Sequence, residues 1–339
     1  MDDMNDGWGG LSPLETERRQ LKRDAGFIGT GMLFQTLLMQ TFFTILVTIL
    51  AMFGAVSPEA IQNNDPYLGW GNTVYLLVYS FVYIVAMGAP MLLASLIFHM
   101  RMNPFGAHQR VPVGTAVFSV PIGMTLCVAA NFAANQIVNF LYIFGIAPPE
   151  YPEMLEPTVT SLILNIFVVA VLPALLEEMV YRGFILQTLR RYGDGMAILV
   201  SAILFGLMHG NILQIPFAFL LGLVMGFLVV QTGNIWLAVA LHFTNNTVAV
   251  LLDYATLNQS TEQANQIVIT GYGICAVAGL LALIPLVLTR SPLLRSLDRS
   301  PSPLTARERE SVLLTSPPFL CGVILYILLT CANIQLVSP

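Results

Sequence analysis

The chain has 339 residues, of which 56% are hydrophobic and only 10% are charged, and its formal net charge is −5. Soluble domains carry about 25% charged residues, so this composition excludes a soluble globular protein and makes the lipid bilayer the expected solvent. The four cysteines all lie in apolar runs without CxxC spacing, which argues against a disulfide framework and a thiolate metal site.

Residues 1–26 are polar and predict a soluble tail. The apolar runs that follow predict nine membrane helices, at 27–56, 72–99, 113–147, 158–189, 196–211, 214–231, 234–252, 267–288 and 317–337. A span needs about 20 residues, so the hairpin formed by 196–211 and 214–231 is a candidate for incomplete crossing. The predicted fold is an all-α polytopic membrane bundle of eight or nine helices.

The last predicted helix stands apart from the others. We expect one transmembrane domain over 27–288, and a Ser/Pro/Arg-rich cytoplasmic linker at 289–316 connects it to the C-terminal helix at 317–337. No sequence repeat suggests the two halves of a transporter.

Lys and Arg residues predict the orientation. With nine helices, all of those outside the predicted spans fall on one side of the membrane: Arg18, Arg19, Lys22, Arg23, Arg101, Arg110, Arg190, Arg191, Arg290, Arg295, Arg299, Arg307 and Arg309. The intervening loops at 57–71, 148–157 and 253–266 contain none. The positive-inside rule makes the basic side cytoplasmic, with the N-terminus inside.

Five ionisable side chains lie within the long apolar runs, namely Glu177, Glu178, Arg182, His209 and His242. Charged groups inside a bilayer are costly and usually functional. Glu178 and Arg182 are four residues apart on one helix, so they can pair. Glu177 points about 100° away around the helix and lacks that partner. Desolvation should therefore make Glu177 more basic, as a general base requires.

The YGDG turn at 192–195 allows the depths of two residues to be compared. If it closes an antiparallel hairpin, Glu177 and His209 stand nearly equally far from its centre, at about 1.5 Å per residue. The flanking polar residues suggest that the turn protrudes into the cytosol. We therefore expect the site to lie in the cytoplasmic half of the membrane.

Two further helices contribute to this cavity. Phe205 and His209 are four residues apart and share a face, and so do His242 and Asn246. Three helices can thus present the carboxylate of Glu177, one imidazole, and an imidazole with an amide to the same space.

The motifs resemble those of the CAAX protease and bacteriocin-processing family, also called the Abi family, which includes type II CAAX prenyl endopeptidases. EEMVYR at 177–182 is similar to its EExxxR motif, FGLMH at 205–209 to FxxxH, and HFTNN at 242–246 to HxxxN. The order and the spacings of 32 and 33 residues between Glu177, His209 and His242 also resemble the family. The resemblance covers about 158–253, the expected catalytic core.

The resemblance implies a glutamate-dependent intramembrane endopeptidase that requires no metal or other cofactor. It implies that Glu177 activates water with help from His209, and that His242 and Asn246 donate to the oxyanion. Glu178, Arg182 and Phe205 would shape the site. The expected partners are membrane lipids and a peptide or protein substrate that enters from the membrane or the cytoplasmic side, with no nucleic acid. The expected location is a bacterial plasma membrane.

Two other functions remain open. A zinc metalloprotease could use Glu177, His209 and His242, because His₂Glu is a known ligand set, although no HExxH motif is present. A non-catalytic membrane partner, an immunity protein or a proton-coupled transporter could use the carboxylates without proteolysis. In that case Glu177 and Glu178 would serve mainly as partners of Arg182.

Overall fold

The computed structural model describes residues 12–63, 65, 67–100, 103–147, 155–288, 293, 297 and 302–336. Residues 1–11 of the predicted tail and much of the predicted linker between 289 and 301 lie outside the described residues. The elements are α1 Pro13–Met52, α2 Pro58–Gln62, α3 Gly71–Ile97, α4 Val113–Ile143, β1 Ile146–Ala147, α5 Val159–Asn165, η1 Ile166–Val171, α6 Leu172–Glu178, η2 Met179–Leu186, α7 Gln187–Arg190, α8 Asp194–Leu207, α9 Ile215–Thr232, α10 Ile235–Thr256, α11 Thr261–Leu288, α12 Ala306–Leu314, α13 Pro317–Ala332 and β2 Gln335–Leu336.

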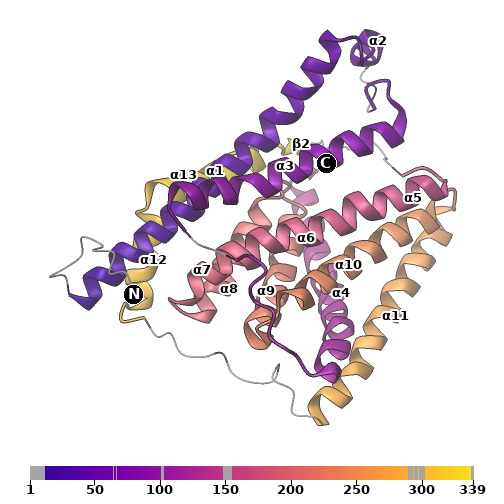
Figure 1. Ribbon diagram of the computed structural model, residues 1–339. Coiled ribbons are helices and arrows are strands. Elements are labelled where there is room, and N and C mark those ends of the chain that lie inside the picture. The colour runs from indigo at the N-terminus through magenta and orange to yellow at the C-terminus, as the bar shows by residue number, and fades with distance from the viewer. Residues whose placement is uncertain are drawn as a thin grey trace.

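The fold is a polytopic helical membrane bundle, as predicted (Figure 1). Within the described residues, seven helices are long and apolar enough to span a membrane, or eight if α12 and α13, bent by 75°, form one span. Helix α8 has only 14 residues, and at about 1.5 Å per residue it is shorter than the hydrocarbon core of roughly 30 Å. The expected short hairpin is therefore confirmed for α8, whereas α9 reaches 18 residues.

The first helix begins earlier than the sequence suggested. Instead of a tail to residue 26, α1 starts at Pro13, where Ser12 and Glu15 form a capping box. From Leu21 onward many of its residues are buried. The polar residues from 13 to 26 therefore belong to the same helix as the apolar run that follows them.

The end of the predicted linker is also folded. Helix α12 starts at a capping box between Thr305 and Glu308, and Val312 and Leu313 are buried. The following helix α13 packs against α1. Gly29 of α1 makes this contact possible, because a Cβ there would lie 2.2 Å from the Pro318 backbone carbon.

A continuous helix from Val159 to Arg190 occupies the middle of the bundle. It contains two π-helical stretches, η1 and η2, on either side of α6. Helix α10 packs against η1 and α6, α3 against α6 and η2, and α8 against η2. Side chains of η2 such as Tyr181 and Phe184 are at most 1% exposed.

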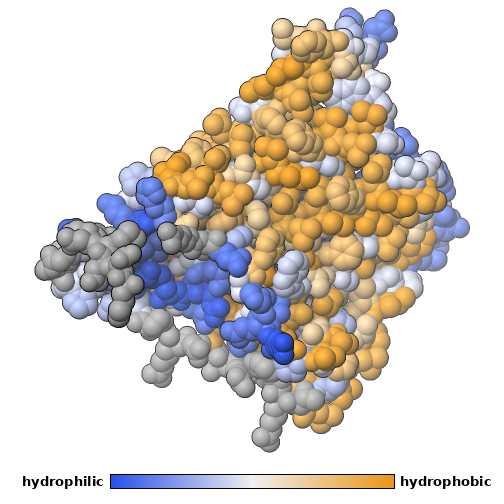
Figure 2. Space-filling view, in the orientation of Figure 1, coloured by the Kyte–Doolittle hydropathy of each residue, from blue (hydrophilic) through white to orange (hydrophobic). Residues whose placement is uncertain are grey.

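Hydrophobic side chains cover most of the face shown in Figure 2, and hydrophilic ones gather near α12 and the start of α1. Ion pairs join separate elements there. Arg18 pairs with Glu308 at 3.0 Å, and Arg191 lies 3.9 Å from Glu17. We call this the basic end of the bundle.

Candidate active site

Glu177 and Glu178 are the last residues of α6, where the α-helix widens into the π-helix η2. π-Helical segments are rare and often occur at functional sites. Both side chains are buried, with Glu177 5% exposed and Glu178 fully enclosed.

Arg182 neutralises Glu178. Its Nη1 lies 3.0 Å from Oε1 of Glu178, and its Nη2 donates to the Gly222 carbonyl oxygen at 3.2 Å. The guanidinium also lies 4.4 Å from the centre of the Phe205 ring, a favourable cation–π arrangement. The predicted pairing of Glu178 with Arg182 is therefore confirmed.

His242 bridges the two glutamates. Its Nδ1 lies 2.9 Å from Oε1 of Glu178, the oxygen that Arg182 also contacts. Since that carboxylate accepts, Nδ1 carries a proton and donates it. The other ring nitrogen, Nε2, faces Oε2 of Glu177 at 3.9 Å. His242 is 3% exposed, so a proton between Nε2 and Glu177 would be shielded from bulk water.

The two oxygens of Glu177 have different surroundings. Oε1 accepts a 2.5 Å hydrogen bond from the hydroxyl of Tyr83. Oε2 is buried without a hydrogen-bond partner among the described residues. A buried carboxylate oxygen without a donor is costly, and the Glu177 side chain lines a cavity that could hold water.

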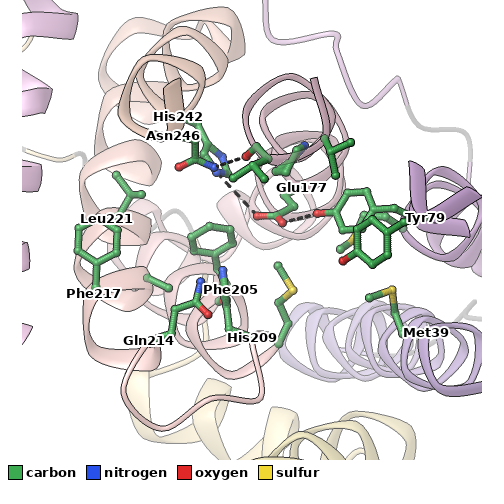
Figure 3. Close-up of a pocket in the computed structure, with 17 residues that line it drawn as sticks. Met39, Tyr79, Glu177, Phe205, His209, Gln214, Phe217, Leu221, His242 and Asn246 are labelled. Carbon is green, nitrogen blue, oxygen red and sulfur yellow. Dashed lines mark hydrogen bonds and ion pairs between the residues drawn. The ribbon is translucent and has the colours of Figure 1, made fainter. Parts of the chain in front are cut away.

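The cavity has a volume of about 330 Å³ (Figure 3). Its lining comes from α1, α3, the central helix, α8, α9, α10 and the turn that joins α8 to α9: Met39, Tyr79, Tyr83, Met87, Val168, Val169, Pro173, Glu177, Phe205, Met208, His209, Gln214, Phe217, Ala218, Leu221, His242 and Asn246. The carboxylate, both imidazoles and the amide from the three motifs thus border one space.

His209 and Asn246 line this cavity, and each is held by a backbone carbonyl. Nδ1 of His209 donates to the oxygen of Phe205 at 2.8 Å, which leaves Nε2 as the acceptor. The amide nitrogen of Asn246 donates to the oxygen of Val169 at 2.8 Å, and its second hydrogen remains available. The ring of Phe205 makes edge contacts with both His209 and His242, with centroids 5.1 Å and 5.9 Å away.

Sequence reasoning missed Tyr83, which contacts Glu177 from α3. A signal was present, because Tyr75, Tyr79 and Tyr83 recur every four residues and so share one helix face. Successive rings of this stripe are stacked, with centroids 6.4 Å and 6.1 Å apart.

The described part of the chain contains no candidate metal site. No group of three or more His, Cys, Asp or Glu residues there could hold a metal ion.

Comparison with known proteins points to one family. The family model "Type II CAAX prenyl endopeptidase Rce1-like" matches residues 159–248, a range that includes all three motifs. The "Putative membrane peptidase YdiL" of Bacillus subtilis is 24% identical over 168 residues, which are 48% of this chain and 68% of that protein. No solved structure matches the chain significantly.

Residues 159–248 of this chain thus resemble the CAAX protease and bacteriocin-processing family. It is a CAAX-protease-like membrane endopeptidase. The family match runs from residue 159 to 248, so α1 to α4 lie before it and α11 to α13 lie after it. Helices α1 and α3 nevertheless contribute Met39, Tyr79 and Tyr83 to the cavity, so the cavity includes residues outside the matched range.

Proposed function

We propose that this membrane protease is glutamate-dependent, with Glu177 as the general base. The observation that carries the proposal is the asymmetry of its carboxylate. Tyr83 holds Oε1, while Oε2 has no hydrogen-bond partner among the described residues and the side chain lines the cavity. Oε2 is thus oriented to take a proton from a water molecule in the cavity.

The proposed reaction is hydrolysis of a peptide bond. The water oxygen attacks the carbonyl carbon and its proton passes to Oε2 of Glu177. The C–N bond of the tetrahedral intermediate then breaks, and the leaving nitrogen takes that proton. His209 assists by accepting a hydrogen bond from the water at its free Nε2.

The negative charge on the carbonyl oxygen needs donors in the same cavity. Asn246 has one amide hydrogen that Val169 does not use, and His242 becomes a donor at Nε2 when protonated. Glu178 accepts a hydrogen bond from its Nδ1 and so holds the ring in place. Preorganised donors of this kind stabilise the transition state more than the ground state. Glu178, Arg182 and Phe205 fix the position of His242.

The natural environment of this activity follows from the exposed apolar surface and the charge distribution. Membrane lipids surround the bundle, and the substrate is a peptide or protein. The Lys and Arg residues at the basic end favour a plasma-membrane orientation in which the N-terminus is cytoplasmic.

Replacing the base tests this proposal. Glu177→Gln keeps the side-chain shape and removes the proton acceptor, so it should abolish proteolysis by purified protein in liposomes while leaving membrane insertion intact. His209→Ala should be similarly damaging. Near wild-type turnover of Glu177→Gln would reject Glu177 as the base and make Glu178 the candidate.

A further inference from the structure

Along the central helix, the active-site cavity lies on one side of Glu177. Val169 and Pro173 line it at eight and four residues before Glu177, and Asn246 lines it four residues after His242. No lining residue comes from 178–192, the part of the described central helix that leads to the basic end. The cavity therefore opens away from the basic end, toward the start of α5 and the end of α10.

The opposite direction is sealed by protein. Every residue from Glu177 to Leu186 is buried. A returning segment, Asn103–Gln109, covers this region and pairs with the turn between α9 and α10, where Ile235 N donates to the Ala107 oxygen at 2.7 Å. Gly183 admits this segment, because a Cβ there would lie 2.4 Å from the Pro104 oxygen.

A second cavity adjoins the active-site cavity at Val169. It has a volume of about 620 Å³ and is lined by Leu155, Asn165, Val169, Val250, Asp253, Thr256, Leu257, Asn258 and Gln259. Val169 lines both cavities, and the hydrogen bond from Asn246 to its oxygen lies at their border. The second cavity is rich in polar side chains and ends where α10 ends, so it can hold water.

Charge distinguishes the two ends of the bundle. The loops at 57–71, 148–157 and 253–266 contain no Lys or Arg. They include carboxylates such as Glu156 and Asp253. We call the end of the bundle that carries these loops the acidic end. Figure 1 places α5 at the opposite side of the molecule from α12 and the N-terminus. By the positive-inside rule the basic end is cytoplasmic and the acidic end is extracytoplasmic.

We propose that water and substrate reach Glu177 from the acidic end. The substrate class is then polypeptides whose scissile bond lies at the extracytoplasmic side of the membrane, and cytoplasmic tails are not cut. This inference rests on the proposed function, because it assigns the cavity at Glu177 to proteolysis. The access path itself is inferred only from the two cavities, the buried stretch from Glu177 to Leu186 and the charge distribution.

Thiol accessibility tests the direction of access. Cys127, Cys275, Cys321 and Cys331 are first replaced by Ala. Single cysteines are then introduced as Phe217→Cys in the active-site cavity, Gln259→Cys in the second cavity, and Arg191→Cys as a marker of the basic end. Oriented vesicles receive a membrane-impermeant quaternary ammonium methanethiosulfonate on one side or the other, and monodispersity in detergent confirms that each variant is folded.

Phe217→Cys and Gln259→Cys should react at least tenfold faster when the reagent is added on the side of the acidic end. Arg191→Cys should react faster when it is added on the opposite side. Reaction of Phe217→Cys from the side that labels Arg191→Cys would overturn the proposal and favour cytoplasmic entry. Failure of Phe217→Cys to react from either side would overturn it too. Labelling needs no turnover, so the Glu177→Gln background should give the same pattern even if Glu177 is not the base.

Discussion

Tyr83 and Glu177, 94 residues apart in the chain, meet through a hydrogen bond from the phenol to one carboxylate oxygen. The bond fixes the rotation of the carboxylate and leaves its other oxygen facing Nε2 of His242 at 3.9 Å. Because Tyr83 lies on α3, outside the family match at 159–248, the orientation of the proposed base depends on a part of the chain that the three motifs do not include.

Tyr83→Phe should therefore impair catalysis without preventing folding. Hydrogen bonds to charged groups contribute about 1.5–3 kcal/mol, so kcat/KM should fall roughly 10- to 100-fold. Steady-state cleavage of a peptide substrate by purified protein measures the loss. Tyr75→Phe is the matched control, because Tyr75 belongs to the same stripe but does not line the cavity. Equal effects of the two substitutions would contradict a specific role for Tyr83.

Arg182→Met should destabilise the fold strongly, since it leaves Glu178 buried with no cation. Breaking a buried ion pair from one side costs about 3–5 kcal/mol. The double variant Glu178→Gln with Arg182→Met should regain part of that stability, because it removes the uncompensated charge as well. Thermal unfolding in detergent measures the stability of the single and the double variant.

Arg190→Met provides the control for this pair. Arg190 contacts Asp194 at 2.9 Å with the same i,i+4 spacing, but its side chain is 31% exposed. Partly exposed ion pairs contribute about 1 kcal/mol or less to stability. The thermal unfolding midpoint of Arg190→Met should therefore differ little from that of the unmodified protein. A double variant no more stable than Arg182→Met alone would show that Glu178 and Arg182 are not energetically coupled.

Metal chelators should leave activity nearly unchanged. The motif set contains no HExxH, and in the proposed mechanism Glu177 activates water directly. Purified protein is incubated with EDTA or phenanthroline and then assayed for peptide cleavage. Complete loss of activity that zinc restores would establish the metalloprotease alternative, with Glu177, His209 and His242 as the ligands to test first.

The sequence contained the motif side chains but not their environment. The four-residue spacings in EEMVYR and HFTNN put Glu178 near Arg182 and His242 near Asn246, and helix geometry carries such local relationships into the structure. The contact of Tyr83 with Glu177 joins two helices, and periodicity within one helix says nothing about which helix lies beside it.

Two other features also escaped prediction for physical reasons. The π-helical turns η1 and η2 depend on packing around the central helix, because its apolar sequence fits an α-helix equally well. The segment Asn103–Gln109 has the composition of an ordinary loop, and only its pairing with 233–235 brings it against the central helix. The depth comparison predicted that Glu177 and His209 lie at the same height in the bundle. It could not indicate whether the cavity extends from them toward the basic end or toward the acidic end.

Asn246 provides the sharpest test of the proposed oxyanion donors. One amide hydrogen binds Val169 and the neighbouring Asn245 donates to its oxygen at 3.0 Å, so the amide is held with its second hydrogen free. A donor that acts mainly in the transition state contributes to kcat more than to substrate binding. Asn246→Ala should therefore lower kcat about 10²-fold, and Asn246→Asp at least as much, because a carboxylate repels the oxyanion.

The assay needs kcat and KM separately, with purified protein in liposomes and with membrane levels of each variant compared. Asn245→Ala keeps the proposed donor and removes only its neighbour, so its effect should be clearly smaller. A change confined to KM would assign Asn246 to substrate binding. Unchanged kinetics would remove Asn246 from the mechanism and leave the hydrogen bond to Val169, at the border of the two cavities, as its function.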